Sequence, residues 1–197
     1  MAGETEPSPR AAVLAPELTA AQLALLAKQP SSETRAAVAA HPNTPAAVLG
    51  RLAAEHPAQV LDNPALSLLR LAHPGLLEGW PAGAVLSLVA QPQAPGWLRR
   101  YGLAHADARF QVAVAGHPAL SAAELEQLAR HRVWKVRARV AARPDLSLEL
   151  LAGLLGDPDY GVRLVLASRP DLSPSAAERL GQDVSLLVRQ AMAQRQG

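Results

Sequence analysis

The segment Val-Arg-Ala-Arg-Val-Ala-Ala-Arg-Pro-Asp-Leu-Ser at residues 136–147 returns 26 residues later, at 162–173, as Val-Arg-Leu-Val-Leu-Ala-Ser-Arg-Pro-Asp-Leu-Ser. A fixed period of 20–50 residues indicates a solenoid, in which each repeat buries its apolar face only against its neighbours. The same interval separates further residues around this segment, namely Pro118, Pro144 and Pro170, Leu120, Leu146 and Leu172, and Arg137, Arg163 and Arg189.

Each repeat is predicted to contain two short helices. Thr19 with Gln22, and Ser121 with Glu124, have the spacing of a capping box at the start of the first helix. The second helix carries apolar residues four positions apart and ends before a proline. Helices of this length are unstable alone, so stacking must hold them. We therefore expect three valines at equivalent positions to point inward, namely Val136, Val162 and Val188.

Composition agrees with helices, because 49% of the residues are apolar but only 3% are aromatic, and Ala and Leu supply most of the apolar share. The predicted fold is an all-α solenoid of paired short helices with about 7–8 repeats. One domain is expected over 12–197, after a disordered polar tail at 1–11. The clear repeats are 18–43, 98–119, 120–145, 146–171 and 172–197, and the degenerate region is 44–97.

Several function classes are disfavoured by what the sequence lacks. It has no cysteine, which excludes disulfides, a thiol nucleophile, a thiolate zinc site and an iron–sulfur cluster on cysteines. No phosphate-binding glycine loop, metalloprotease motif or serine-hydrolase motif is present. We therefore expect no metal, no cofactor and no enzymatic activity. An acidic start without a long apolar run predicts a soluble, cytoplasmic protein that does not bind membranes.

The pattern Leu-x-x-x-x-Leu-x-x-Leu-Ala, followed by Asp-Pro and Val-Arg-x-x-Val-Ala-x-x-Pro, resembles the leucine-rich repeat variant family, a HEAT-like helical solenoid. It covers 16–43 and 98–197 well. The resemblance implies paired α and short 3₁₀ helices in a right-handed superhelix. Members of the family can carry a cysteine-rich iron–sulfur module before the repeats, and this implication does not carry over to a chain without cysteine. Such a motif indicates fold far more than function.

Two columns of residues recur once per repeat. The arginine of the Val-Arg pair is predicted to bond carbonyls or an acid of the neighbouring turn, and an anion-binding ladder is the alternative; its members are Arg35, Arg137, Arg163 and Arg189. The residue before the repeat proline lies where a helix ends, so a cation there meets the negative end of the helix dipole. The alternative is a row of charges that binds a phosphate backbone. This column comprises His41, Asn63, His73, His117, Arg143, Arg169 and Arg195.

Basic residues are most concentrated between residues 130 and 143. Residues 1–97 hold 5 Lys/Arg and 7 Asp/Glu, a net charge of −2, whereas 98–197 hold 14 and 10, a net charge of +4. A basic cluster around a tryptophan fits a nucleic-acid site, in which cations bind phosphates and the ring stacks on a base. The alternative is a solvated face balanced by acids of the next layer, with the tryptophan packed in the joint. The candidate residues are Arg130, Arg132, Trp134, Lys135, Arg139 and Arg143.

Three aromatic residues lie in or beside the irregular middle, where core plugs are more frequent than interaction hot spots; they are Trp80, Trp97 and Tyr101. The only local His–carboxylate pair is His105 with Asp107, which is weak grounds for catalysis. The sequence thus predicts a non-catalytic scaffold that presents a curved surface to a protein or peptide. The alternative is a nucleic-acid-binding solenoid, and a remote third is an enzyme resembling alkylated-DNA glycosylases.

Overall fold

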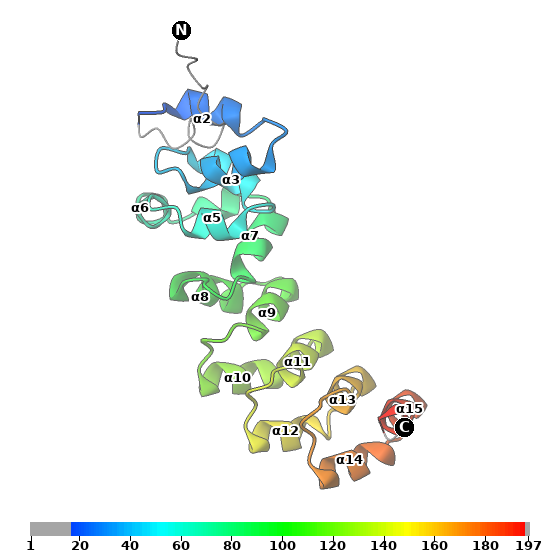
Figure 1. Cartoon of the computed structure of the whole chain (residues 1–197). Coiled ribbons are helices and arrows are strands. Elements are labelled where there is room, and N and C mark those ends of the chain that lie inside the picture. The colour runs from blue at the N-terminus through cyan, green and yellow to red at the C-terminus, as the bar shows by residue number, and fades with distance from the viewer. Residues whose placement is uncertain (1–16, 196–197) are drawn as a thin grey trace. The chain divides into compact units, whose positions relative to one another are not determined.

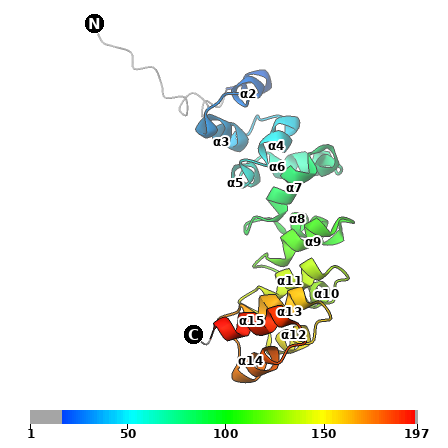
Figure 2. The same ribbon diagram turned by 90° about the vertical axis from the view of Figure 1, so that its right-hand side faces the viewer.

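The computed structural model describes residues 17–195 (Figures 1 and 2), and in this range the chain is helical without β-strands. The predicted all-α repeat fold is confirmed. The chain divides into two compact units, residues 1–100 and 101–197. The predicted disordered tail at 1–11 lies outside the described residues. The single solenoid expected over 12–197 stays a prediction, because the chain forms two compact units that are described separately.

Unit 1 (residues 1–100) contains short helices joined by tight turns. Its second helices α3, α5 and α7 contact one another in succession, as expected for stacked repeats. Helix α8 begins in this unit and ends in the next. The elements are α2 (Ala20–Leu26), α3 (Ser32–Ala40), α4 (Ala46–Leu52), α5 (Pro57–Leu61), α6 (Leu66–Ala72), the 3₁₀ helix η1 (Leu76–Gly79), α7 (Ala82–Val89) and α8 (Gly96–Ala104).

Unit 2 (residues 101–197) shows the repeat in its regular form. Its helices are α9 (Ala108–Ala115), α10 (Ala122–Ala129), α11 (Trp134–Ala141), α12 (Leu148–Leu154), α13 (Tyr160–Ala167), α14 (Pro174–Gly181) and α15 (Leu186–Gln194). The second helices α11, α13 and α15 pack closely in one row, while the first helices α10, α12 and α14 form a looser second row (Figure 1). Because the rows differ in spacing, unit 2 curves with the second helices on its inner side.

The core of unit 2 lies between the two rows. Val136, Val162 and Val188 are each 0% exposed, so the predicted equivalent inward positions are confirmed. Leu166 and Leu180 complete the same apolar cluster. Burial of a side chain of this size contributes about 1.5–3 kcal/mol. Each repeat therefore contributes one buried valine to the core, and this packing stabilises helices that are too short to be stable alone.

Both predicted capping boxes are present. The side chain of Gln22 accepts a hydrogen bond from the backbone N–H of Thr19 at 2.9 Å, and that of Glu124 accepts one from Ser121 at 2.7 Å. Each threonine or serine hydroxyl in turn caps the helix N-terminus. The boundary between the turn and the first helix is thus set locally by sequence.

The second helices differ from the form that the family resemblance implied. In unit 2 both helices of each pair are α-helices, and η1 is the one 3₁₀ helix among residues 17–195. Second helices of eight or nine residues exceed the three or four residues at which 3₁₀ geometry is usual. Their length therefore favours α-helical hydrogen bonding.

The degenerate region 44–97 consists of two altered repeats. In one of them the second helix, α5, is only five residues long. In the other, α6 and η1 together precede the second helix α7. Trp80 is 8% exposed, and its Cγ lies 2.7 Å from the place where a Cβ on Gly50 would stand. Trp80 is therefore a core plug, and glycine at position 50 is needed to admit its ring.

Candidate functional site

The arginines of the Val-Arg pair bind carboxylates of the following repeat. Arg137 Nε and Nη2 donate to the two carboxylate oxygens of Asp157 at 2.6 and 2.8 Å, and Nη1 donates to the carbonyl oxygen of His131 at 2.7 Å. Arg163 repeats this geometry with Asp183, at 2.7 and 2.9 Å. Paired parallel bonds of this kind fix orientation as well as charge. The acid stands 20 residues after its arginine in both cases.

The same register continues elsewhere with altered partners. Arg35 donates to both carboxylate oxygens of Glu55 and to the carbonyl oxygens of Gln29 and Pro30. Arg189 Nη1 donates to the carbonyl oxygens of Asp183 and Val184, at 2.5 and 3.2 Å. Within the described residues, Arg189 has no carboxylate partner.

One repeat replaces the arginine and its acid together. Gln111 stands in the arginine's place and donates to the carbonyl oxygens of Leu103 and His105. Twenty residues later the acid is replaced by His131, whose Nδ1 accepts the backbone N–H of Val133 at 3.1 Å. Asp183 Oδ1 accepts the equivalent N–H from Ser185 at 2.7 Å. Histidine therefore keeps the turn bond of this position while giving up the ion pair.

The arginines of the Val-Arg pair and the acids that they bind form what we call the arginine ladder, and within each ion pair the two charges compensate each other. Hydrogen bonds from Arg163 hold the pKa of Asp183 below its ordinary value, burial opposes this shift, and the N–H of Ser185 adds to it. The bond to Asp183 raises the pKa of Arg163 in turn. The two side chains are only 10% and 7% exposed. Because these charged side chains are paired with each other and nearly buried, they are not accessible to a ligand.

The column before the repeat proline joins repeats in a second way. Arg143 Nη1 donates to the carbonyl oxygens of Ala115 and His117, at 3.2 and 2.7 Å, and its other nitrogens hold Asp145 at 2.9 and 2.6 Å. Arg169 bonds Ala141, Arg143 and Asp171 in the same manner. Both guanidinium groups are buried. The carbonyls that they satisfy belong to the preceding repeat, not to their own helix.

In unit 1 this column has different members. Asn63 Nδ2 donates to the carbonyl oxygens of Ala39 and His41 at 2.8 Å each, as the arginines do in unit 2. His73 does not belong to the column, because it is exposed at the end of the inserted helix α6. Gln91, which follows α7 and precedes Pro92, takes the equivalent place.

The five basic residues of the candidate cluster are divided among three locations. Arg130 and Arg132 lie at the turn between α10 and α11, Lys135 and Arg139 are exposed on α11, and Arg143 is buried with Asp145. The first four form no ion pair with a described residue. Arg130 and Arg132 thus line one cleft, Arg139 and Arg143 line another, and Arg143 presents almost no charge to solvent.

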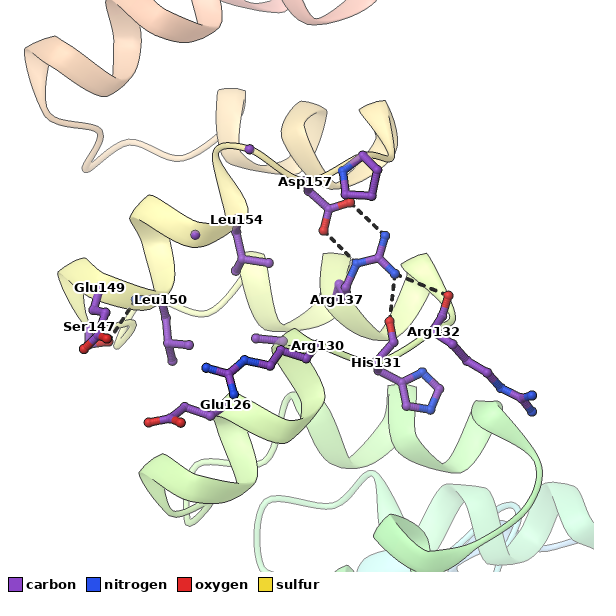
Figure 3. A pocket seen from close by; sticks show the side chains of 14 residues that line it. Glu126, Arg130, His131, Arg132, Arg137, Ser147, Glu149, Leu150, Leu154 and Asp157 are labelled. Carbon is purple, nitrogen blue, oxygen red and sulfur yellow. Dashed lines mark hydrogen bonds and ion pairs between the residues drawn. The ribbon is translucent and has the colours of Figure 1, made fainter.

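A cleft of about 610 Å³ separates α10 from α12. Figure 3 shows Arg130 pointing into it between Glu126 and Leu150, while Arg132 extends away beyond the Arg137–Asp157 pair. The space beside Gly153 is open, since a Cβ there would meet nothing within 4 Å.

One repeat later the glycine is replaced by an arginine. Arg179 stands 26 residues after Gly153, and its Nη2 lies 3.2 Å from the place of a Cβ on Gly156. A long side chain therefore occupies the equivalent space between α12 and α14.

Large apolar side chains are exposed at the starts of the second helices α11, α13 and α15, and we define them as the apolar stripe: Trp134, Tyr160, Leu186 and Leu187. Their side chains are 40%, 50%, 58% and 50% exposed. Trp134 is two positions from the buried Val136, about 200° around the helix, and so points away from the first-helix row. Its ring carbon Cζ3 lies 2.8 Å from the place of a Cβ on Gly161, and its neighbour Lys135 has Nζ 5.9 Å from its ring.

Sequence reasoning did not identify this stripe. Trp134, Tyr160 and Leu186 stand 26 residues apart, each at the first position of a second helix. That spacing was a usable signal, because large apolar residues at one register position in three repeats form a row. Exposure could not be read from it, since a helix start can face the core or solvent.

The cations of α11 are not repeated on the helices that follow. One and two repeats after Lys135 stand Gly161 and Leu187, and the residue one repeat after Arg139 is Val165. Arg139 itself lies over Gly116, with Nη2 2.7 Å from the place of a Cβ there. The inner face of unit 2 is thus basic at α11 and apolar at α13 and α15.

The two other aromatic residues of the middle are partly buried. The Arg70 guanidinium carbon lies 4.8 Å from the centre of the Trp97 ring, a cation–π contact within unit 1. Tyr101 packs edge-on against Phe110, with ring centres 5.9 Å apart. Both side chains join helices and present little of their surface to solvent.

Comparison with known proteins bears on the repeat itself. The family model of the leucine rich repeat variant matches residues 33–57 and 134–159. In these two segments the chain is similar to the leucine rich repeat variant family. Each matched segment begins in a second helix and holds one Val-Arg arginine with its acid, Arg35 with Glu55 and Arg137 with Asp157. No curated protein and no solved structure matches the chain.

Two further features are absent from the part of the chain that the structure describes. Between residues 17 and 195, no group of three His, Asp or Glu residues is arranged to hold a metal ion. None of the helices in that range has the length and apolar character needed to span a bilayer.

Proposed function

We propose that this chain is a non-catalytic scaffold that binds a protein or peptide on the inner face of unit 2. The observation that carries the proposal is the apolar stripe, whose four side chains are each 40–58% exposed. Exposed apolar groups that gather in one place typically mark interaction surfaces. The two arginine columns fix the helices beneath the stripe, so little ordering is required when a partner binds.

The distribution of charge favours a protein over a nucleic acid. A phosphate backbone is best matched by cations that recur along the whole binding face. Lys135 and Arg139 supply two such cations on α11, but Gly161 and Val165 stand at their places on α13. The buried Arg143 and Arg169 add none. A mixed basic and apolar face is typical of protein interfaces.

The local His–carboxylate pair supports a role without catalysis. His105 Nδ1 accepts the backbone N–H of Asp107 at 3.0 Å, and the Asp107 carboxylate caps α9 and binds Arg109 Nε at 2.8 Å. Both groups are therefore engaged in shaping the turn. Trp80 is 8% exposed and packs against Gly50, so its ring is not available to a ligand.

The test is a cross-linking pull-down with the whole chain and two variants. We expect the double variant Trp134→Ala, Tyr160→Ala to lose the protein partners captured by the parent chain. Leu148→Ala is the matched control, because Leu148 is 84% exposed but belongs to the first-helix row. It is expected to retain the same partners. Circular dichroism confirms that each variant is folded.

Nucleic-acid binding is measured in parallel, as affinity for single- and double-stranded DNA against salt concentration. The proposal predicts weak binding, whereas phosphate neutralisation gives log affinity against log salt a slope of about −0.9 for each phosphate on duplex DNA. Tight, steeply salt-dependent DNA binding without a protein partner overturns the proposal.

A further inference from the structure

The inner face of unit 2 is polarised, with cations at one end and apolar side chains at the other. We infer that its occupant is a protein segment with an acidic end followed by an apolar end, seated with the acidic end on α11 and the apolar end on α13 and α15. This inference rests on the proposed function and adds to it the chemistry of the partner.

The apolar end is built from side chains that the fold leaves uncovered. Trp134 lies over Gly161, so its ring bridges from α11 to α13 instead of standing free. Tyr160, one repeat on, occupies the same register, and Leu186 and Leu187 continue the row on α15. Three neighbouring helices thus each present an exposed apolar side chain at the same register position, where a partner's aliphatic or aromatic side chains gain burial.

The basic end consists of cations without an internal carboxylate. Lys135 and Arg139 are exposed and form no ion pair with a described residue. Asp157 binds Arg137 and Asp145 binds Arg143. Asp159, whose Oδ1 stands near the Trp134 ring at Gly161, accepts the backbone N–H of Gly161 at 2.8 Å. An incoming carboxylate therefore meets two free cations without displacing an existing bond. A basic segment would meet repulsion here instead.

The spacing of the layers sets the length of the segment. Packed helices lie about 8–10 Å apart, so the row from α11 to α15 is roughly 16–20 Å long. An extended chain covers this in about six residues. A peptide of three acidic residues followed by three large apolar residues is thus the minimal probe of the face.

The experiment measures binding of labelled peptides by fluorescence anisotropy. The probe is Glu-Glu-Glu-Leu-Phe-Leu with a flexible labelled tail, beside one peptide with lysines for the acids and one with serines for the apolar residues. The parent chain is expected to bind the acidic–apolar peptide at least tenfold more tightly than either control peptide.

Charge reversal on the protein tests which end is acidic. The double variant Lys135→Glu, Arg139→Glu is expected to lose at least tenfold for the acidic peptide and to gain affinity for the lysine peptide. Arg179→Glu is the matched control, since it makes the same kind of change on the exposed first-helix row. It should leave the preference unchanged.

Each outcome decides the inference separately from the proposed function. Equal binding of all peptides, preference for the lysine peptide, or no peptide binding overturns it. If the pull-down partner still depends on Trp134 and Tyr160, the scaffold function stands in all three cases. Binding of single-stranded DNA that the charge-reversal variant abolishes also overturns the inference, because a nucleic acid is then the occupant.

Discussion

Replacing one ladder acid tests whether the ion pairs hold the repeats together. Asp183 accepts two bonds from Arg163 and one from the N–H of Ser185. Asp183→Asn keeps one oxygen but turns an N–H toward Arg163 Nε. A buried guanidinium is then left without its counter-charge, and loss of one partner of a buried pair costs about 3–5 kcal/mol.

We expect the lower end of that range, about 3 kcal/mol, because one bond to Arg163 and the bond to Ser185 survive. For a typical urea dependence of about 1.5 kcal/mol per molar, the unfolding midpoint falls by about 2 M. The assay is urea unfolding followed by circular dichroism. Glu55→Gln is the control, because its carboxylate holds the same register but is 47% exposed. Its effect is expected to be much smaller.

The chain itself supplies a rescue variant. Gln111 and His131 occupy the two positions of this pair in another repeat without an ion pair. Arg163→Gln combined with Asp183→His copies that arrangement and should restore most of the stability lost by Asp183→Asn. If the double variant is as unstable as the single one, or if Asp183→Asn costs no more than Glu55→Gln, the account of the ladder is refuted.

Three further predictions concern stability. Because the pKa of Asp183 is lowered in the folded state, its contribution is complete above about pH 5 and is lost as pH falls through the folded pKa, so the advantage of the parent over Asp183→Asn in urea shrinks between pH 5 and pH 2. Gly153→Ala meets no atom and should stabilise by about 0.5–1 kcal/mol, whereas Gly50→Ala meets Trp80 Cγ at 2.7 Å and should cost about 1–3 kcal/mol, both measured by urea unfolding; equal effects would contradict the packing described for Trp80. Arg143→Met leaves the carbonyls of Ala115 and His117 without their donor and should cost about 1–3 kcal/mol, while Arg139→Met on the surface should stay within about 0.5 kcal/mol, and thermal unfolding that ranks them the other way would disprove the buried role.

The 26-residue interval predicted the regular repeats well, for a physical reason. Equivalent residues face equivalent neighbours in a stack, so the inward valines Val136, Val162 and Val188 could be identified from spacing alone. The irregular middle could not. Helix α5 has five residues, and α6 with η1 fills the place of one helix, so no fixed interval describes them. His73 was therefore assigned to a column in which Gln91 stands.

The roles of the cations were only partly predictable. Spacing identified Arg137 and Arg163, and their acids could also have been found, because Asp157 and Asp183 continue a column that begins with His105 and His131. The burial of Arg143 could not be derived, since the carbonyls that it satisfies lie 26 and 28 residues earlier in the chain. A run of basic residues in sequence thus divides into surface and interior positions that only the stacking determines.

The two arginine columns also define which stretch of chain is a transferable module. Arg137 and Asp157 both fall inside the segment 134–159, so the ion pair between its two helices is contained in the segment itself. Arg143 lies in the same segment but donates to the carbonyl oxygens of Ala115 and His117, so it requires another repeat on the N-terminal side. Grafting in this frame, α11 with α12 instead of α10 with α11, therefore keeps the Arg137–Asp157 pair inside the block. The bonds of Arg137 to His131 and of Arg143 to Ala115 and His117 must then be supplied by the repeat that precedes it.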